Sequence, residues 1–96
     1  MWRLRSPYKQ ALSLMQEIKR HERSLLQLDR SAADANMVEE ALQGRVCKCW
    51  ETIEDDRHLL NASHVIQRWL ATEEDPDAAL AKMTDADVKR RLADGL

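Results

Sequence analysis

The sequence predicts an all-α protein: a small helical bundle built on a long antiparallel helical hairpin, followed by short C-terminal helices. Three observations favour this fold class. The 96 residues include only two glycines and two prolines, so turn-forming residues are scarce. Apolar residues recur at three- and four-residue spacing over two long segments. Hydrophobic residues make up 44% of the chain, which is too many for an extended disordered chain, and the length fits one helical domain over 1–96.

A first helix is expected from residue 7 to residue 30, after an N-terminal arm of residues 1–6. Ser6 can cap its start, and Pro7 is tolerated in the first helical turn. The apolar stripe of this segment consists of Tyr8, Ala11, Leu12, Leu14, Met15, Ile18, Leu25, Leu26 and Leu28. A stripe of this width is typical of a helix that buries a broad face.

A second helical region is expected over residues 36–72, with Asn36 or Asp34 as the capping residue. The pattern becomes polar on all sides for one turn around Asp55. The region is therefore either one long helix or two helices separated by a kink or break near Asp55 or Asn61.

Within this region, Gly44 interrupts the helical pattern. Glycine costs about 1 kcal/mol relative to alanine inside a helix, so we expect another helix to approach closely there. Trp50 and Trp69 fall in the apolar pattern and are expected in the core.

Short helices are expected over residues 76–94. Asp75 precedes Pro76 and is a suitable cap for the first of them. Thr84 and Asp87 have the spacing of a capping box at the start of the next.

Charge is distributed unevenly along the chain, whose formal net charge is -2. Residues 1–30 carry seven basic and three acidic groups, a net charge of +4, which leaves -6 for the remainder. Aromatic and arginine side chains are the usual anchors of protein interfaces. The partner-binding surface predicted on this ground consists of Trp2, Arg3, Arg5, Tyr8, Arg20 and Arg23.

Signatures of catalysis, cofactors and metal binding are missing from the sequence. It contains no glycine-rich phosphate loop and no nucleophile elbow. Cys47, Cys49, His58 and His64 lie in one segment, but cysteines two residues apart on a helix diverge, and there is no C-x-x-C pair. We therefore expect no catalytic site, no cofactor and no metal.

One short motif bears on enzymatic activity. Arg57-His58 followed by His64 has the form R-H-x-x-x-x-x-H, which resembles the arginine–histidine motif of the all-α HEPN-type ribonucleases. The resemblance covers eight of the 96 residues. It implies that Arg57 and His64 lie on one helical face, two turns apart, and act on a scissile phosphate.

The sequence predicts a non-enzymatic helical protein-interaction module, meaning a small adaptor, accessory subunit or inhibitor that binds a larger protein, or a chain that associates with itself. Nucleic-acid binding through the basic N-terminal segment is the alternative, and an HEPN-like ribonuclease is the third. No apolar run is long enough to span a membrane, and no secretory signal is visible. A cytoplasmic location is expected, because Cys47 and Cys49 are poorly placed for a disulfide.

Overall fold

The computed structural model describes residues 6–94 of the chain. These residues form five helices and no strand, which confirms the predicted all-α fold. The helices are α1 (Pro7–Leu26), α2 (Ala35–Glu54), α3 (Arg57–Leu70), α4 (Pro76–Lys82) and α5 (Asp85–Ala93). None of them is both long enough and apolar enough to cross a membrane.

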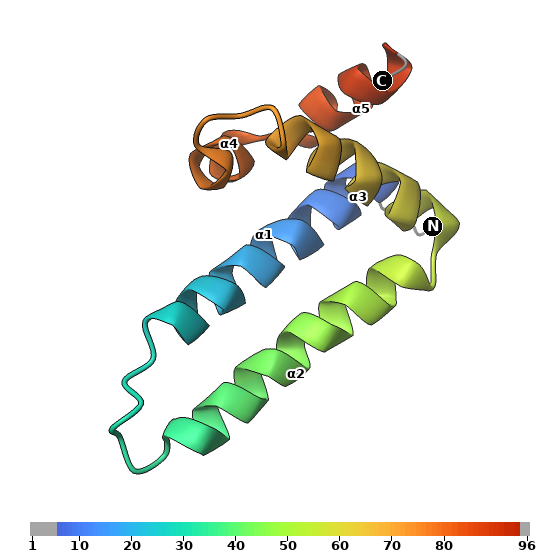
Figure 1. Ribbon diagram of the computed structural model, residues 1–96. Helices are drawn as coiled ribbons and strands as arrows, with labels where there is room; N and C mark the ends of the chain where they lie inside the picture. Colours follow the sequence, from blue (N-terminus) through green and yellow to red (C-terminus); the bar gives the residue numbers. More distant parts are fainter. Residues whose placement is uncertain (1–5, 95–96) are drawn as a thin grey trace.

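Helices α1 and α2 form the hairpin and run side by side in opposite directions (Figure 1). Helix α3 turns back across the beginning of α1, and α4 and α5 lie beyond it (Figure 1). Helix α1 packs against all four other helices, whereas α2 packs only against α1 and α3 in the described chain. A hydrogen bond from Gln16 Nε2 to the Leu80 carbonyl oxygen, 2.9 Å long, fastens α4 to the middle of α1.

The first helix is shorter than predicted, ending at Leu26 instead of residue 30. The chain turns immediately afterwards, because the Asp29 carboxylate accepts hydrogen bonds from the Ser31 amide (3.0 Å) and hydroxyl (2.6 Å). Such a local bond competes with the helical hydrogen-bond pattern and favours a turn. Helix α2 then begins at Ala35 with Asp34 in the capping position, although the Asp34 side chain makes no capping bond.

The predicted region 36–72 is two helices, with the break at Asp55 and Asp56. The Asp56 carboxylate accepts hydrogen bonds from the amides of His58 (2.9 Å) and Leu59 (3.3 Å), and so caps a new helix. The polar turn in the sequence is therefore the start of α3.

The short C-terminal helices begin at the predicted caps. Asp75 accepts a hydrogen bond from the Ala78 amide (3.1 Å) at the start of α4. Thr84 and Asp87 form a complete capping box at the start of α5, in which each side chain accepts from the amide of the other at 3.2 Å. Ser6 makes no such side-chain bond, although Pro7 does occupy the first turn of α1.

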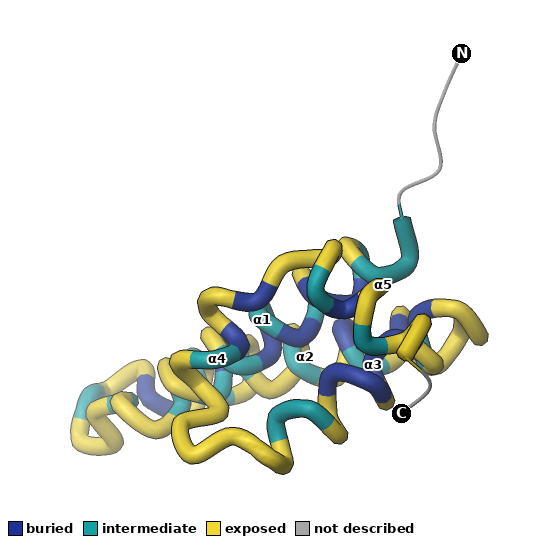
Figure 2. The backbone as a smooth tube through the Cα atoms, turned by 90° about the horizontal axis from the view of Figure 1, so that it is seen from above, coloured by how far each residue is buried: buried dark blue, intermediate teal, exposed yellow. Residues whose placement is uncertain are grey.

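The core is formed mainly by α1 and α3, with contributions from the end of α2 and from the short C-terminal helices. Its buried apolar residues are Ala11, Leu12, Met15, Ile18, Cys49, Ile53, Leu59, Ala62, Val65, Ile66, Leu80, Met83 and Val88. Trp50 and Trp69 are partly buried and pack against the edge of this cluster. Figure 2 shows that buried positions gather around α1 and α3, whereas most of α2 is exposed.

The expected close approach at Gly44 does not occur within residues 6–94. Gly44 is exposed, and a Cβ atom added there would meet nothing within 4 Å. That expectation was wrong because Gly44 borders an open hollow that it shares with Leu14 and Glu17 of α1, and neither side chain comes within contact distance of it.

The molecule is more extended than most domains of its length. Its radius of gyration is 15.1 Å, whereas a compact domain of this size has about 12.5 Å. The hairpin end, meaning the connection 27–34 and the helix ends beside it, lies away from α3 to α5 (Figure 1). The α2 side of the molecule is therefore left largely uncovered by the rest of the described chain.

Candidate functional site

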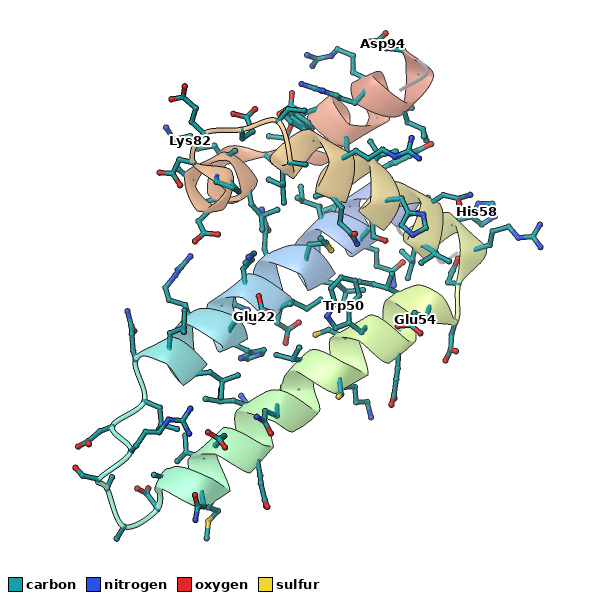
Figure 3. The ribbon with its side chains drawn as sticks, in the orientation of Figure 1. Glu22, Trp50, Glu54, His58, Lys82 and Asp94 are labelled. Atoms are coloured by element: carbon teal, nitrogen blue, oxygen red, sulfur yellow. The ribbon has the colours of Figure 1, made fainter. Side chains whose placement is uncertain are left out.

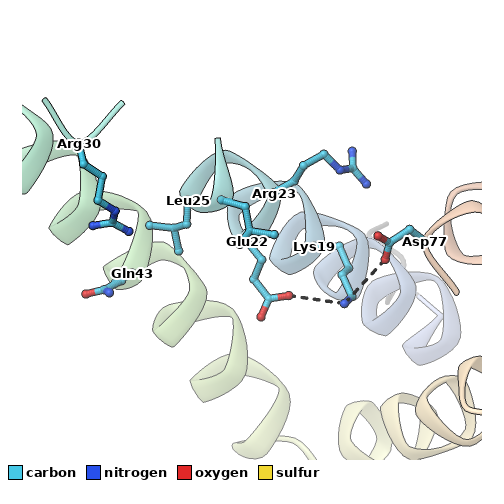
Figure 4. Close-up of a pocket in the computed structure, with 8 residues that line it drawn as sticks. Lys19, Glu22, Arg23, Leu25, Arg30, Gln43 and Asp77 are labelled. Carbon is cyan, nitrogen blue, oxygen red and sulfur yellow. Dashed lines mark ion pairs between the residues drawn. The ribbon is translucent and has the colours of Figure 1, made fainter. Parts of the chain in front are cut away.

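A groove runs along the second half of α1 toward the hairpin end. It consists of two adjoining hollows of about 460 and 240 Å³ that share Lys19, Arg23 and Asp77. We call this the hairpin groove. Its lining residues are Gln16, Lys19, Arg20, Glu22, Arg23, Leu25, Leu26, Arg30, Gln43, Asp77, Leu80 and Ala81. Figure 4 shows the larger hollow, with side chains from α1, α2, α4 and the connection 27–34.

Several charges in the hairpin groove neutralise one another. Lys19 Nζ lies 3.8 Å from Glu22 Oε1 and also 3.8 Å from Asp77 Oδ1 (Figure 4). Arg30 forms an ion pair with Glu39 of α2 at the hairpin end. The Lys19–Asp77 pair joins α1 to α4, so the wall of the groove is built from helices that are distant in sequence.

Two basic groups of the groove keep their charge uncompensated. Arg20 and Arg23 are exposed, and no carboxylate of residues 6–94 lies within 4 Å of either guanidinium. They are three residues apart on α1 and so project from neighbouring positions of the same face. The groove therefore presents a surplus of positive charge.

The hairpin end also exposes apolar surface. Leu26, which lines the groove, is 88% exposed, and Met37 in the first turn of α2 is 74% exposed. Apolar surface rimmed by charged residues is typical of interaction sites. The apolar stripe predicted for residues 7–30 therefore extends beyond the part of α1 that the other helices bury.

The structure divides the residues predicted to bind a partner. Arg20 and Arg23 lie together in the hairpin groove. Tyr8 lies twelve residues earlier on α1, about 18 Å along the helix axis, is half-buried and packs against the core. Trp2, Arg3 and Arg5 lie outside the described residues.

Sequence reasoning predicted only Arg20 and Arg23 among the lining residues of the groove, and Leu26 and Asp77 show why others were missed. Leu26 was assigned to the buried stripe, and nothing in its spacing distinguishes it from the core leucines. Asp77 enters the groove because α4 returns to the middle of α1. The sequence indicated only that Asp77 lies in the first turn of a short helix, and not which helix it would face.

A separate hollow of about 320 Å³ lies at the opposite end of α1. Its walls come from α1, α3 and α5, and its lining residues are Pro7, Tyr8, His58, Asn61, His64, Val65, Arg68 and Leu92. Arg57, at the first position of α3, does not line it. Of the two residues of the HEPN-like motif, this hollow therefore contains only His64.

The cysteines lie in different surroundings. Burial raises the pKa of the Cys49 thiol, and the neighbouring Glu17 carboxylate raises it further. A raised pKa disfavours the nucleophilic thiolate. Cys47 is exposed, and residues 6–94 contain no group of three or more His, Cys, Asp or Glu side chains placed to hold a metal ion.

Comparison with known proteins gives no match: no family model fits the chain, and neither a curated protein nor a solved structure is significantly similar to it.

Proposed function

We propose that the chain is a helical protein-interaction module that binds an acidic amphipathic helix of a larger protein in the hairpin groove. The observation that carries the proposal is the pairing of an exposed apolar end, Leu26, with two uncompensated arginines, Arg20 and Arg23, along one groove. The chain would act as an adaptor, accessory subunit or inhibitor.

The dimensions of the hairpin groove suit a short helix. Its α1 wall extends from Gln16 to Leu26, a rise of about 15 Å, which corresponds to between two and three helical turns of a ligand. Amphipathic helices bind such grooves by placing two or three apolar side chains into them. Leu25 and Leu26 would contact that apolar face.

The positive charge of the groove favours a partner helix whose polar face is acidic. Lys19 and Arg30 are already paired within the chain, so Arg20 and Arg23 are the groups left to attract carboxylates. Exposed complementary charges raise the association rate and orient the partner more than they raise affinity. We place the interaction in the cytoplasm, since Cys47 and Cys49 are free thiols.

Affinity capture with two matched charge-reversal variants tests the proposal. The test variant carries Arg20→Glu and Arg23→Glu in the groove, and the control carries Arg45→Glu and Lys48→Glu. Both pairs are exposed and three residues apart on a long helix, but Arg45 and Lys48 lie outside the groove. We expect the test variant to lose a protein partner that the wild type and the control retain after nuclease treatment.

The captured partner must also meet the chemical description. A synthetic peptide of its acidic amphipathic helix should compete with it, and Leu26→Ser should weaken binding about tenfold. Equal retention by both charge variants would contradict the proposal. Loss of all partners on nuclease treatment, with binding that falls steeply with salt, would instead assign the arginines to nucleic acid.

A further inference from the structure

The hollow between the start of α1, the outer face of α3 and the end of α5 contains a set of polar groups unlike the rest of the surface. Its polar side chains are Tyr8, His58, Asn61, His64 and Arg68. Each of them can donate a hydrogen bond. Among residues 6–94, no carboxylate lines the hollow, although Asp and Glu together account for 17 of the 96 residues of the chain.

These donors are not engaged elsewhere in the fold. No ion pair or side-chain hydrogen bond within residues 6–94 involves the side chains of His58, His64 or Arg68. The nearest acidic group in the sequence, Asp56, directs its carboxylate to the amides of His58 and Leu59. His58 lies at the beginning of α3, as Figure 3 shows.

The positions of these residues follow from the geometry of α3. His58, Asn61 and Arg68 follow one another at intervals of three and seven residues, so they lie along one face of the helix. His64 stands beside Asn61 on the same side, and Tyr8 closes the hollow from α1. Pro7, Val65 and Leu92 provide the apolar part of the lining.

We propose that this hollow binds the phosphate group of a small phosphate monoester, independently of the hairpin groove. Arg68 supplies a positive charge, and the side chains of His58, Asn61, His64 and Tyr8 can donate hydrogen bonds to the phosphate oxygens. A phosphate monoester carries about -1.5 to -2 charges at neutral pH and has three strong acceptor oxygens. The volume of about 320 Å³ leaves room for an organic group against Val65 and Leu92.

Phenyl phosphate is a suitable probe, because it combines the phosphate with a compact apolar ring. We expect it to bind saturably in the millimolar range or below, and to bind more tightly than inorganic phosphate. Phenol, which lacks the phosphate, and benzoate, which carries a single charge, should bind less well. Chemical-shift changes in NMR spectra of the wild type should map to residues of the hollow.

Variants of exposed side chains test the assignment without disturbing the core. Arg68→Gln and His64→Gln should each weaken phenyl phosphate binding, Arg68→Gln by about tenfold. Arg45→Gln, which removes an exposed arginine on α2, should leave it unchanged. Shift changes spread over all basic residues, equal effects of Arg68→Gln and Arg45→Gln, or equal binding of benzoate and phenyl phosphate would each overturn the proposal.

Discussion

Replacement of Gly44 by alanine should stabilise the protein. Gly44 lies in the interior of α2 and is exposed, and an added Cβ atom would meet no neighbour from residues 6–94 within 4 Å. The methyl group therefore creates no clash, while alanine loses less backbone freedom than glycine when the helix forms. The expected gain in the free energy of unfolding is about 0.5–1 kcal/mol.

The corresponding rise in melting temperature follows from the size of the chain. Unfolding entropy is about 2.1 cal/mol/K per residue, or about 200 cal/mol/K for 96 residues. The gain therefore raises Tm by about 2.5–5 °C. Thermal unfolding followed by far-ultraviolet circular dichroism in dilute solution measures this shift directly.

Gln43→Ala is the matched control, because Gln43 is the preceding residue, is also exposed, and has a helix propensity close to that of alanine. Its Tm should change by less than half as much. A Tm for Gly44→Ala at or below the wild-type value would refute the reasoning. Such a result would mean that the glycine is needed for a contact that the single chain does not contain.

Three further results are expected. Ile66→Ala should lower the free energy of unfolding in urea by about 2–5 kcal/mol, because Ile66 is fully buried; a cost below that of Ile66→Val would contradict this. Hydrogen bonds from Thr84 lower the pKa of Asp87 from 3.8, so the capping box should stabilise α5 above that pH and lose its effect as the pH falls below it. The protection of α5 amides against hydrogen exchange, relative to the intrinsic rate at each pH, should then decrease; unchanged protection below pH 3.8 would count against this. Arg91→Gln should cost about 0.5–1 kcal/mol in urea unfolding, because the Arg91 guanidinium lies 4.3 Å from the Trp69 ring centroid, and this cost should vanish in a Trp69→Leu background.

Local features of the fold were predictable because short-range chemistry determines them. Asp75 and the Thr84–Asp87 pair cap their helices through bonds to amides three residues away. A sequence of four residues contains all the groups that such a cap requires. The break before α3 was indicated only by the loss of the apolar pattern around Asp55, and the cap that makes it, Asp56, was not predicted.

Features that depend on packing were not predictable in the same way. Leu26 continues the apolar spacing of α1, yet it is exposed because the Asp29 turn ends the helix there, and α3 and α5 cover the opposite end of α1. Gly44 was expected at a helix contact because glycine destabilises a helix interior, but the sequence does not show what faces that position of α2. Periodicity gives the face of a helix and does not show what covers it.

In the candidate site, too, the local features were predictable and the features that depend on packing were not. The positive charge of Arg20 and Arg23 could be read from the sequence, since both lie in a basic segment. Their separation from Tyr8 could not, because it depends on which part of α1 the later helices cover. Asp77 could be placed opposite Lys19 only after α4 was seen to return to α1.

The central position of α1 has a consequence for the order in which the protein folds. The hairpin can close over nine residues, from Arg30 to Glu39, whereas the bond between Gln16 and Leu80 closes a loop of 64 residues. The longer closure costs about 1.7 kcal/mol more in chain entropy. Contacts between α1 and α2 should therefore form in the folding nucleus, and α4 and α5 should dock later. Truncating Leu80 or Val88 should then speed unfolding with little effect on the folding rate, whereas truncating Ile53 should slow folding.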